Sequence, residues 1–205
     1  MTRYGMAIDK TKCIGCKTCL MACKISNNLP RDVWFNRYET EGAEAEFAAV
    51  GTYPNLKMVS YTVACQHCAN PACVSVCPTG ASIQDEDGIV RVLEDKCIGC
   101  KSCIQACPYD VRTLIEKPEY YTDDVQLGRH TETPCTDGVV AKCTFCKDLI
   151  VQGKNPACMD LCPARARFWG DLDDPDSELS KLIAARDYDL LMEEVGTEPS
   201  VFYLK

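Results

Sequence analysis

The sequence predicts an α+β fold made of two nested modules with short strands, short helices and surface insertions. Sixteen of the seventeen cysteines in the 205-residue chain fall into four compact groups, and these groups repeat one another in pairs. Between the groups, only short runs show strand or helix periodicity, as expected where bound cofactors replace much of a hydrophobic core. The cysteine groups therefore decide the fold.

The four groups have regular spacing. The first and third follow C-x2-C-x2-C-x3-C, whereas the second and fourth place four and eleven residues before the third cysteine. In chain order the groups are Cys13, Cys16, Cys19 and Cys23; Cys65, Cys68, Cys73 and Cys77; Cys97, Cys100, Cys103 and Cys107; and Cys143, Cys146, Cys158 and Cys162. The third group matches in every interval the run with which bacterial ferredoxins bind [4Fe–4S] clusters, so the sequence predicts four such clusters as cofactors.

The groups also show an internal duplication. CIGCKTCLMAC, which starts at Cys13, closely repeats CIGCKSCIQAC, which starts at Cys97. NPACVSVCPTGA, which starts at Asn70, returns as NPACMDLCPARA from Asn155. The chain is therefore interpreted as a duplicated unit of two motifs.

The chemistry of a cubane cluster requires the motifs to work in pairs. Three thiolates come from one tight loop, and the fourth cysteine of that motif ligates the other cluster of the pair. Nineteen residues separate Cys77 from Cys97, a short connection that favours pairing the second motif with the third and leaves the first to pair with the fourth. The duplication alone equally allows the first motif to pair with the second and the third with the fourth.

Nested pairing predicts four ligand sets and no catalytic residue. An inner ferredoxin-like module, residues 58–118, contains motifs two and three, and an outer module, residues 1–57 plus 119–205, contains motifs one and four. The predicted inner ligands are Cys65, Cys68, Cys73 and Cys107 for one cluster and Cys97, Cys100, Cys103 and Cys77 for the next. The predicted outer ligands are Cys13, Cys16, Cys19 and Cys162 for one cluster and Cys143, Cys146, Cys158 and Cys23 for the other.

Zinc and disulfides explain these cysteines less well. Tetrahedral zinc sites take two C-x2-C pairs and leave the third cysteine and the cysteine before proline without a role. A disulfide framework needs an oxidising compartment, yet no leader pattern precedes Cys13, and the cysteine count is odd. Cys135, which stands outside the four groups, is interpreted as an unligated thiol.

Charge and hydropathy exclude other classes. The formal net charge of −8 argues against a nucleic-acid partner, because affinity for phosphate backbones comes from clustered Lys and Arg. No window approaches the roughly 20 apolar residues of a spanning helix. We therefore expect a soluble or peripheral protein.

The expected elements are few and short. Residues 4–8 and 59–63 are strand candidates, and 82–84 with 89–92 form a predicted hairpin. Residues 177–186 have helical periodicity, and 201–204 could end the chain as a strand. Two polar insertions, residues 27–56 and 116–140, are expected to lie over the surface or to grip a partner.

Lysines flank three of the four motifs. They precede the first cysteine or follow the second in motifs one, three and four, at Lys12, Lys96 and Lys142 and at Lys17, Lys101 and Lys147. The second motif has Ala64 and Ala69 at these places. If the lysines offset cluster charge, the cluster held by Cys65, Cys68 and Cys73 should be among the lowest in reduction potential unless burial or hydrogen bonding overrides charge; alternatively, they are solvent-facing lysines with little influence. His67, inside the second motif, is expected to form a hydrogen bond to the loop or to a partner.

Nearly the whole chain resembles the iron–sulfur electron-transfer (beta) subunits of the dimethyl sulfoxide reductase and polysulfide reductase family of molybdoenzymes. The resemblance rests on the order of the four motifs, on CQHCANPACVSVCPTGA, CIGCKSCIQACPYDVR and KCTFCKDLIVQGKNPACMDLCPARA, and on the GDLDDPDS that follows. These motifs are specific for the family and nearly silent on the substrate. Some relatives replace a cysteine of the third motif and carry a [3Fe–4S] cluster, whereas this chain keeps all four, which implies four cubanes.

The resemblance implies a non-catalytic subunit of an oxidoreductase complex of anaerobic respiration. Its implied partners are a molybdenum (or tungsten) bis-pyranopterin catalytic subunit, toward the outer module, and a quinone-reactive integral membrane subunit, toward the inner module. Two alternatives stay open: the small subunit of a soluble molybdenum hydroxyl-transferring or dehydroxylating enzyme, and a free polyferredoxin. The implied location is peripheral to the cytoplasmic membrane, on a side that the sequence leaves open, because leaderless subunits of this family often cross with an exported partner.

Overall fold

The computed structural model describes residues 2–42, 47–122, 124–129 and 135–205. Its strands are β1 (Tyr4–Asp9), β2 (Asn36–Thr40), β3 (Val50–Thr52), β4 (Asn55–Lys57), β5 (Ser60–Ala64), β6 (Ser82–Gln84), β7 (Val90–Val92), β8 (Thr113–Leu114), β9 (Val140–Ala141), β10 (Arg167–Asp171), β11 (Tyr188–Asp189) and β12 (Val201–Leu204). Its helices are α1 (Thr18–Ser26), α2 (Ala72–Ser75), α3 (Ser102–Gln105), α4 (Lys147–Ile150), α5 (Ala157–Asp160) and α6 (Glu178–Ala185), with 3-10 turns at Glu94–Lys96 and Glu193–Val195. The α+β prediction is confirmed.

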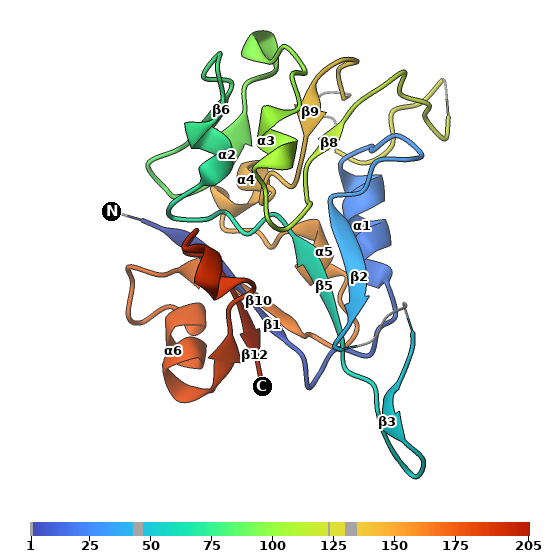
Figure 1. Ribbon diagram of the computed structural model, residues 1–205, viewed down its shortest axis with the longest axis vertical. Coiled ribbons are helices and arrows are strands. Elements are labelled where there is room, and N and C mark those ends of the chain that lie inside the picture. The colour runs from blue at the N-terminus through green and yellow to red at the C-terminus, as the bar shows by residue number, and fades with distance from the viewer. Residues whose placement is uncertain (1, 43–46, 123, 130–134) are drawn as a thin grey trace.

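The largest sheet joins the beginning and the end of the chain. Its strand order is β10-β1-β12-β11, with β1 antiparallel to β10 and parallel to β12. Side chains alternate along β1, so that Met6 and Ile8 face a core shared with Phe145 and Tyr203, while Ala7 faces the opposite side. In Figure 1 this sheet lies at the lower left, with α6 beside it.

Helix α6 covers the second face of this sheet. It begins after Ser177, whose side-chain oxygen accepts a hydrogen bond from the backbone N–H of Ser180 (3.0 Å). Leu179, Ala7 and Leu204 are each 0% exposed and pack together. This small cluster holds the helix against β1 and β12.

A Leu179→Ala variant is expected to lower the free energy of unfolding by about 2–5 kcal/mol, because it opens a cavity in this cluster. Denaturant unfolding followed by circular dichroism measures the change. Val151→Ala is the matched control, because Val151 is 62% exposed and its truncation should cost less than about 0.5 kcal/mol. Equal losses in the two variants would contradict the packing role of Leu179.

The short helices of the cysteine motifs pack in two pairs. Helix α1, in the first motif, contacts α5, in the fourth, and α2, in the second motif, contacts α3, in the third. Figure 1 shows α2 and α3 together at the top and α1 beside α5 in the middle. The helices of the motifs that nested pairing joins are therefore neighbours in space.

Three two-stranded ladders complete the central part of the molecule. β2 pairs with β5, β6 with β7 and β8 with β9, all antiparallel. The hairpin predicted at 82–84 and 89–92 is confirmed as β6 and β7, and the strands predicted at 4–8, 59–63 and 201–204 are confirmed as β1, β5 and β12. The first insertion, for which no strand was predicted, supplies β2 and β3 and most of β4.

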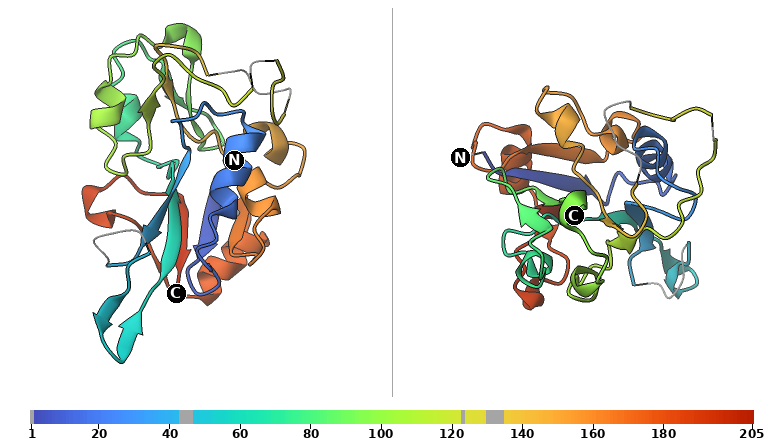
Figure 2. Two further views of the ribbon diagram at one scale, coloured as in Figure 1. Left: turned by 90° about the vertical axis from the view of Figure 1, so that its right-hand side faces the viewer. Right: turned by 90° about the horizontal axis from the view of Figure 1, so that it is seen from above.

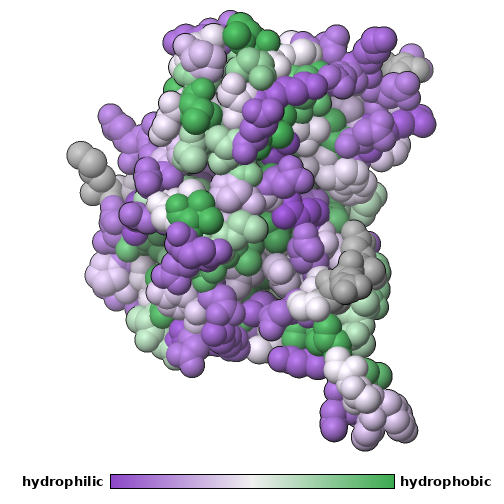
Figure 3. Space-filling model, in the orientation of Figure 1, coloured by the Kyte–Doolittle hydropathy of each residue, from purple (hydrophilic) through white to green (hydrophobic). Residues whose placement is uncertain are grey.

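The β3–β4 hairpin projects away from the body of the protein, as Figures 1 and 2 show from two directions. Its tip exposes Tyr53 (85%) and Leu56 (54%). On the face drawn in Figure 3, hydrophilic and hydrophobic residues are interspersed over most of the surface. Within the part of the chain that the structure describes, no helix has the length and apolar character needed to cross a bilayer.

Candidate metal centres

Two of the predicted ligand sets line cavities of their own. One cavity has Cys13, Cys16, Cys19 and Cys162 in its wall, together with Ile8, Ile14 and Tyr38. The other has Cys77, Cys97, Cys100 and Cys103, together with Ala81, Val92 and Val140. Four thiols in an otherwise largely apolar wall fit an iron–sulfur cluster, because thiolates are its ligands and an apolar shell limits solvent access.

The other two sets lie deeper. Burial raises the pKa of the Cys23 thiol, and so do the nearby thiols of Cys143, Cys158 and Cys146. In the last set, burial raises the pKa of Cys73, which has Cys65 and Cys107 as charged neighbours. Cys68 in turn lies near Cys65 and Cys73. The structure thus brings the members of each predicted set into one neighbourhood.

The loop of each cysteine motif reverses direction at the same position. The second residue after the first cysteine has a positive φ in all four motifs: Gly15 (67°), His67 (43°), Gly99 (65°) and Phe145 (59°). This left-handed residue reverses the chain, so that the first and second cysteines of the motif can face one centre. The reversal is tightest against neighbouring backbone at Gly99, where an added Cβ would lie 2.4 Å from the carbonyl oxygen of Gly138.

Burial alone disfavours the thiolates that a cluster needs. It raises the pKa of Cys143 to about 12 and that of Cys68 to about 11. At Cys77 burial also raises the pKa. Hydrogen bonds with the backbone N–H of Ser82 (3.3 Å to Sγ) and with the hydroxyl and backbone N–H of Thr79 outweigh burial and lower the pKa to about 7. The deep sites therefore need bound metal or nearby positive charge to hold ionised sulfur.

Several N–H groups point at ligand sulfurs. Asn27 donates from its side-chain amide to Cys23 Sγ (3.3 Å), and the backbone N–H of Ala166 donates to Cys162 Sγ (3.4 Å). Arg112 and Arg167 also donate to cysteine sulfur. Neither arginine was predicted from the sequence, although each stands five residues after the last cysteine of its motif, in CPYDVR and CPARAR.

The six flanking lysines do not share one environment. Lys101 is exposed and pairs with Glu116 (3.2 Å), while Lys147 pairs with Asp87 (2.6 Å). Lys17 lies 4.4 Å from the ring centroid of Phe47. Lys142 is buried, with 3% exposure. Adjacency in the sequence therefore does not assign a lysine to the cluster of its own motif.

His67 forms a hydrogen bond, but with strand β7, which lies outside its own loop. The side chain is 1% exposed, and its Nδ1 accepts a hydrogen bond from the backbone N–H of Val90 (3.1 Å). Its ring stacks edge-on against Phe145 (5.2 Å between centroids). His67 thus ties the second motif to β7 and to the fourth motif.

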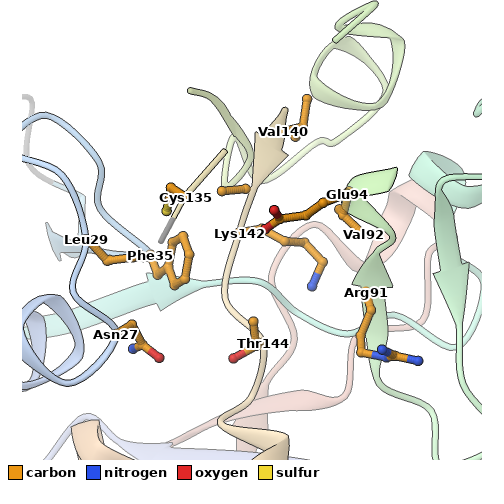
Figure 4. A pocket seen from close by; sticks show the side chains of 11 residues that line it. Asn27, Leu29, Phe35, Arg91, Val92, Glu94, Cys135, Val140, Lys142 and Thr144 are labelled. Carbon is orange, nitrogen blue, oxygen red and sulfur yellow. The ribbon is translucent and has the colours of Figure 1, made fainter. Parts of the chain in front are cut away.

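Cys135 stands outside the four groups in the sequence, but it packs against the apolar cluster that contains Cys23. Figure 4 shows Cys135 in the wall of a cavity, near Leu29 and Phe35 and across from Lys142, whose amino group points away from it. The hydroxyl of Tyr120 donates to the backbone oxygen of Cys135 (3.3 Å). Among the described residues, none of the sixteen predicted ligand cysteines lines this cavity.

Fold and site together define an iron–sulfur protein of the dicluster ferredoxin type. Two sequence profiles described as 4Fe-4S dicluster domain match residues 12–81 and 56–122. These matches and the seventeen cysteines support four [4Fe–4S] clusters as cofactors. The matches overlap at 56–81, and the first of them spans motifs one and two.

Curated relatives cover the whole chain. It is 44% identical over 211 residues to a Halobacterium salinarum protein provisionally named as an iron–sulfur subunit of dimethyl sulfoxide reductase, covering 100% of this chain and 79% of the relative. It is 36% identical to the arsenate respiratory reductase iron–sulfur subunit of a Shewanella species, covering 99% and 96%. It is 38% identical to a subunit of the sulfite dehydrogenase of Allochromatium vinosum, covering 100% and 83%.

The chain therefore belongs to the family of iron–sulfur electron-transfer subunits of dimethyl sulfoxide reductase-type molybdoenzymes. Members of this family are the electron-transfer and not the catalytic subunits of their complexes. The family predicted from the four motifs is confirmed.

Proposed function

We propose that this chain relays electrons through four [4Fe–4S] clusters between a quinone-reactive membrane subunit and a molybdenum (or tungsten) bis-pyranopterin catalytic subunit. The family membership supports a catalytic partner of that kind. We also propose that a membrane subunit is present and that the chain, as part of the complex, lies peripheral to the cytoplasmic membrane. When bound, the clusters supply one-electron chemistry, and the protein supplies spacing, burial and hydrogen bonds.

The proposed ligands follow the nested pairing. They are Cys13, Cys16, Cys19 and Cys162; Cys143, Cys146, Cys158 and Cys23; Cys65, Cys68, Cys73 and Cys107; and Cys97, Cys100, Cys103 and Cys77. The packing of α1 against α5 and of α2 against α3 supports this pairing over the sequential one. The two cavities support it as well, because each combines cysteines of the paired motifs.

The four sets form a row with an exposed cysteine at each end. The Cys13 set lies next to the Cys143 set, since Cys158 and Cys19 are electrostatic neighbours, and Cys143 is likewise a neighbour of Cys65. Only Cys16 and Cys100 are exposed among all the cysteines, which the structure describes in full. This is the observation that carries the proposal, because a relay needs one accessible cluster for the donor and another for the acceptor.

Iron and acid-labile sulfide analysis of the anaerobically purified protein tests the cluster count. We expect about sixteen iron and about sixteen sulfide per chain, from four clusters of four each. Low-temperature EPR of the reduced protein should show interacting S = 1/2 signals. About twelve iron in a fully loaded sample would contradict the four-cluster proposal.

Purification of the natural complex tests the partners separately. We expect a tagged chain to bring down a large molybdenum- or tungsten-containing subunit and an integral membrane subunit. Recovery of the catalytic subunit alone would contradict the quinone branch of the proposal. Recovery of the chain alone, with clusters intact, would favour a free electron carrier.

A further inference from the structure

Four Lys and Arg side chains are buried among the described residues. Lys24 donates to the carbonyl oxygens of Pro30, Arg31 and Val33, and the other three lie among the cysteine sets. Arg112, Lys142 and Arg167 are 4%, 3% and 7% exposed. None of them has a carboxylate within ion-pair distance among the described residues; the buried carboxylate found there, Asp9, pairs with Arg186. Burying an unpaired cation is costly, so an unseen negative charge is the expected partner.

Arg112 lies between the two inner sets. Its Nη2 donates to Cys73 Sγ (2.9 Å), and its Nη1 donates to Ser82 Oγ (2.9 Å). Burial opposes the charge of Arg112, but the thiols of Cys73 and Cys103 raise its pKa. Cys73 and Cys103 belong to different proposed clusters, so one guanidinium faces both.

Arg167 occupies the equivalent place between the two outer sets. Its Nη1 donates to Cys158 Sγ (3.3 Å), and the side chain also lines the cavity of the Cys13 set. Its Nη2 donates to Thr62 Oγ1 and to Asn36 Oδ1 (3.4 Å), which fixes the guanidinium plane. Burial opposes its charge, while the thiols of Cys158 and Cys19 raise its pKa.

The two arginines are related by the duplication. Cys73 and Cys158 are the third cysteines of motifs two and four, and Cys103 and Cys19 are the third cysteines of motifs three and one. Each arginine thus stands between the third cysteines of the two motifs in its own module. This repeated placement is evidence for a shared role.

Lys142 lies between the modules. Its Nζ donates to the carbonyl oxygens of Val90 and of Cys143 (2.7 Å for the latter), and it acts electrostatically on the thiols of both Cys65 and Cys143. Figure 4 shows its amino group extended into the cavity wall away from the Cys135 side. Each of the three gaps in the row of sets therefore contains one buried cation.

We propose that Arg167, Lys142 and Arg112 are inter-cluster counter-charges, each of which raises the reduction potentials of the two clusters that it separates. The proposal rests on the ligand sets of the proposed function. An oxidised cluster with four thiolates carries roughly −2 charge, and reduction adds another negative charge at a site of low dielectric, where a nearby cation has its largest effect.

This arrangement also removes the basis for the potential predicted from the flanking lysines. The second motif has no lysine beside its cysteines, and the sequence therefore predicts that the Cys65 cluster is among the lowest in potential. Under the counter-charge proposal this expectation no longer follows, because the Cys65 set has Arg112 and Lys142 as neighbours.

EPR-monitored redox titration of the holoprotein tests the proposal. Arg112→Gln, which keeps an N–H donor but removes the charge, should lower the potentials of both inner clusters and leave the Cys13 cluster unchanged. Arg167→Gln should lower both outer clusters and leave the Cys97 cluster unchanged. We expect at least a tenfold fall in the reduced-to-oxidised ratio of each affected cluster at fixed potential, which is about 59 mV for a one-electron couple.

The lysine variants separate charge from geometry. Arg112→Lys and Arg167→Lys should keep potentials close to the wild type, because the charge remains. If a glutamine variant loses iron, the lysine variant at the same position is used instead. Retained clusters with near-native potentials in the lysine variant support the proposal, and a tenfold change in their reduced-to-oxidised ratio overturns it. A shift confined to one cluster of a module, or none in an iron-replete glutamine variant, also overturns it.

Lys101→Met is the matched surface control. Lys101 is exposed and pairs with Glu116, so any effect on the Cys97 cluster should shrink as salt is raised. The effect of the buried arginines should persist in high salt. Equal salt sensitivity would overturn the counter-charge role. A wrong cluster count would instead appear as a wild-type iron content away from about sixteen, and wrong ligand sets as loss of the Cys13 signal in the Cys77→Ser variant.

Discussion

Replacing Cys100 with serine is expected to damage one cluster and leave the other three in place. Cys100 is exposed in the wall of the cavity that also contains Cys77, Cys97 and Cys103. Loss of a thiolate should reduce the iron content from about sixteen to about twelve, or to about fifteen if a three-iron cluster remains. Iron analysis and EPR measure the change.

A Cys77→Ser variant tests the pairing, because Cys77 completes the Cys97 set if the second motif pairs with the third and the Cys13 set if it pairs with the first. The signals of both outer clusters should persist, because motifs one and four contribute nothing to the Cys97 set. Loss of the signal assigned to Cys13, Cys16 and Cys19 would instead favour another pairing. Cys135→Ser is the matched control, since Cys135 lies outside the four sets and its replacement should leave the iron count unchanged.

A Gly99→Ala variant is expected to destabilise the third motif more than its small change in size suggests. Gly99 has a φ of 65°, and an added Cβ would meet the carbonyl oxygen of Gly138 at 2.4 Å. The left-handed conformation alone costs an alanine about 1–2 kcal/mol, and the backbone at Gly138, just before β9, must also move. We expect loss of at least about 3 kcal/mol of unfolding free energy and reduced occupancy of the Cys97 cluster.

Gly153→Ala provides the comparison. Gly153 has a φ of 70°, but no atom lies within 4 Å of its added Cβ. This variant should carry only the conformational cost of about 1–2 kcal/mol and should keep its iron. Denaturant unfolding and iron analysis of both variants give the difference, and equal behaviour would show that the contact with Gly138 is unimportant.

The motifs could be predicted from the sequence because ligand spacing is a local property. The same holds for β1, β6 and β12, whose apolar residues are close together in the chain. Strand β2 was missed because its residues are NRYET, and the buried Asn36 in it accepts a hydrogen bond from the distant Arg167. A polar residue that pairs across 131 positions has no local signature.

The cations of the site show the same limit. Lysines were assigned to clusters by their neighbours in the sequence, yet Lys147 turns toward Asp85 and Asp87 of the β6–β7 hairpin. Arg112 and Arg167 follow the last cysteines of their motifs by five residues, and only the folded loop brings each to sulfur. Charge around a cluster depends on the three-dimensional path of the chain.

The sheet that joins both parts of the chain bears on biosynthesis. Strand β1 has β10 and β12 as its partners, so it stays unpaired in this sheet until at least residues 167–171 of β10 have been synthesised. The β6–β7 hairpin, in contrast, closes over a few residues. The inner motifs can therefore come together before this sheet forms, whereas β1, just before the first motif, must wait for β10, which follows the fourth motif in the chain.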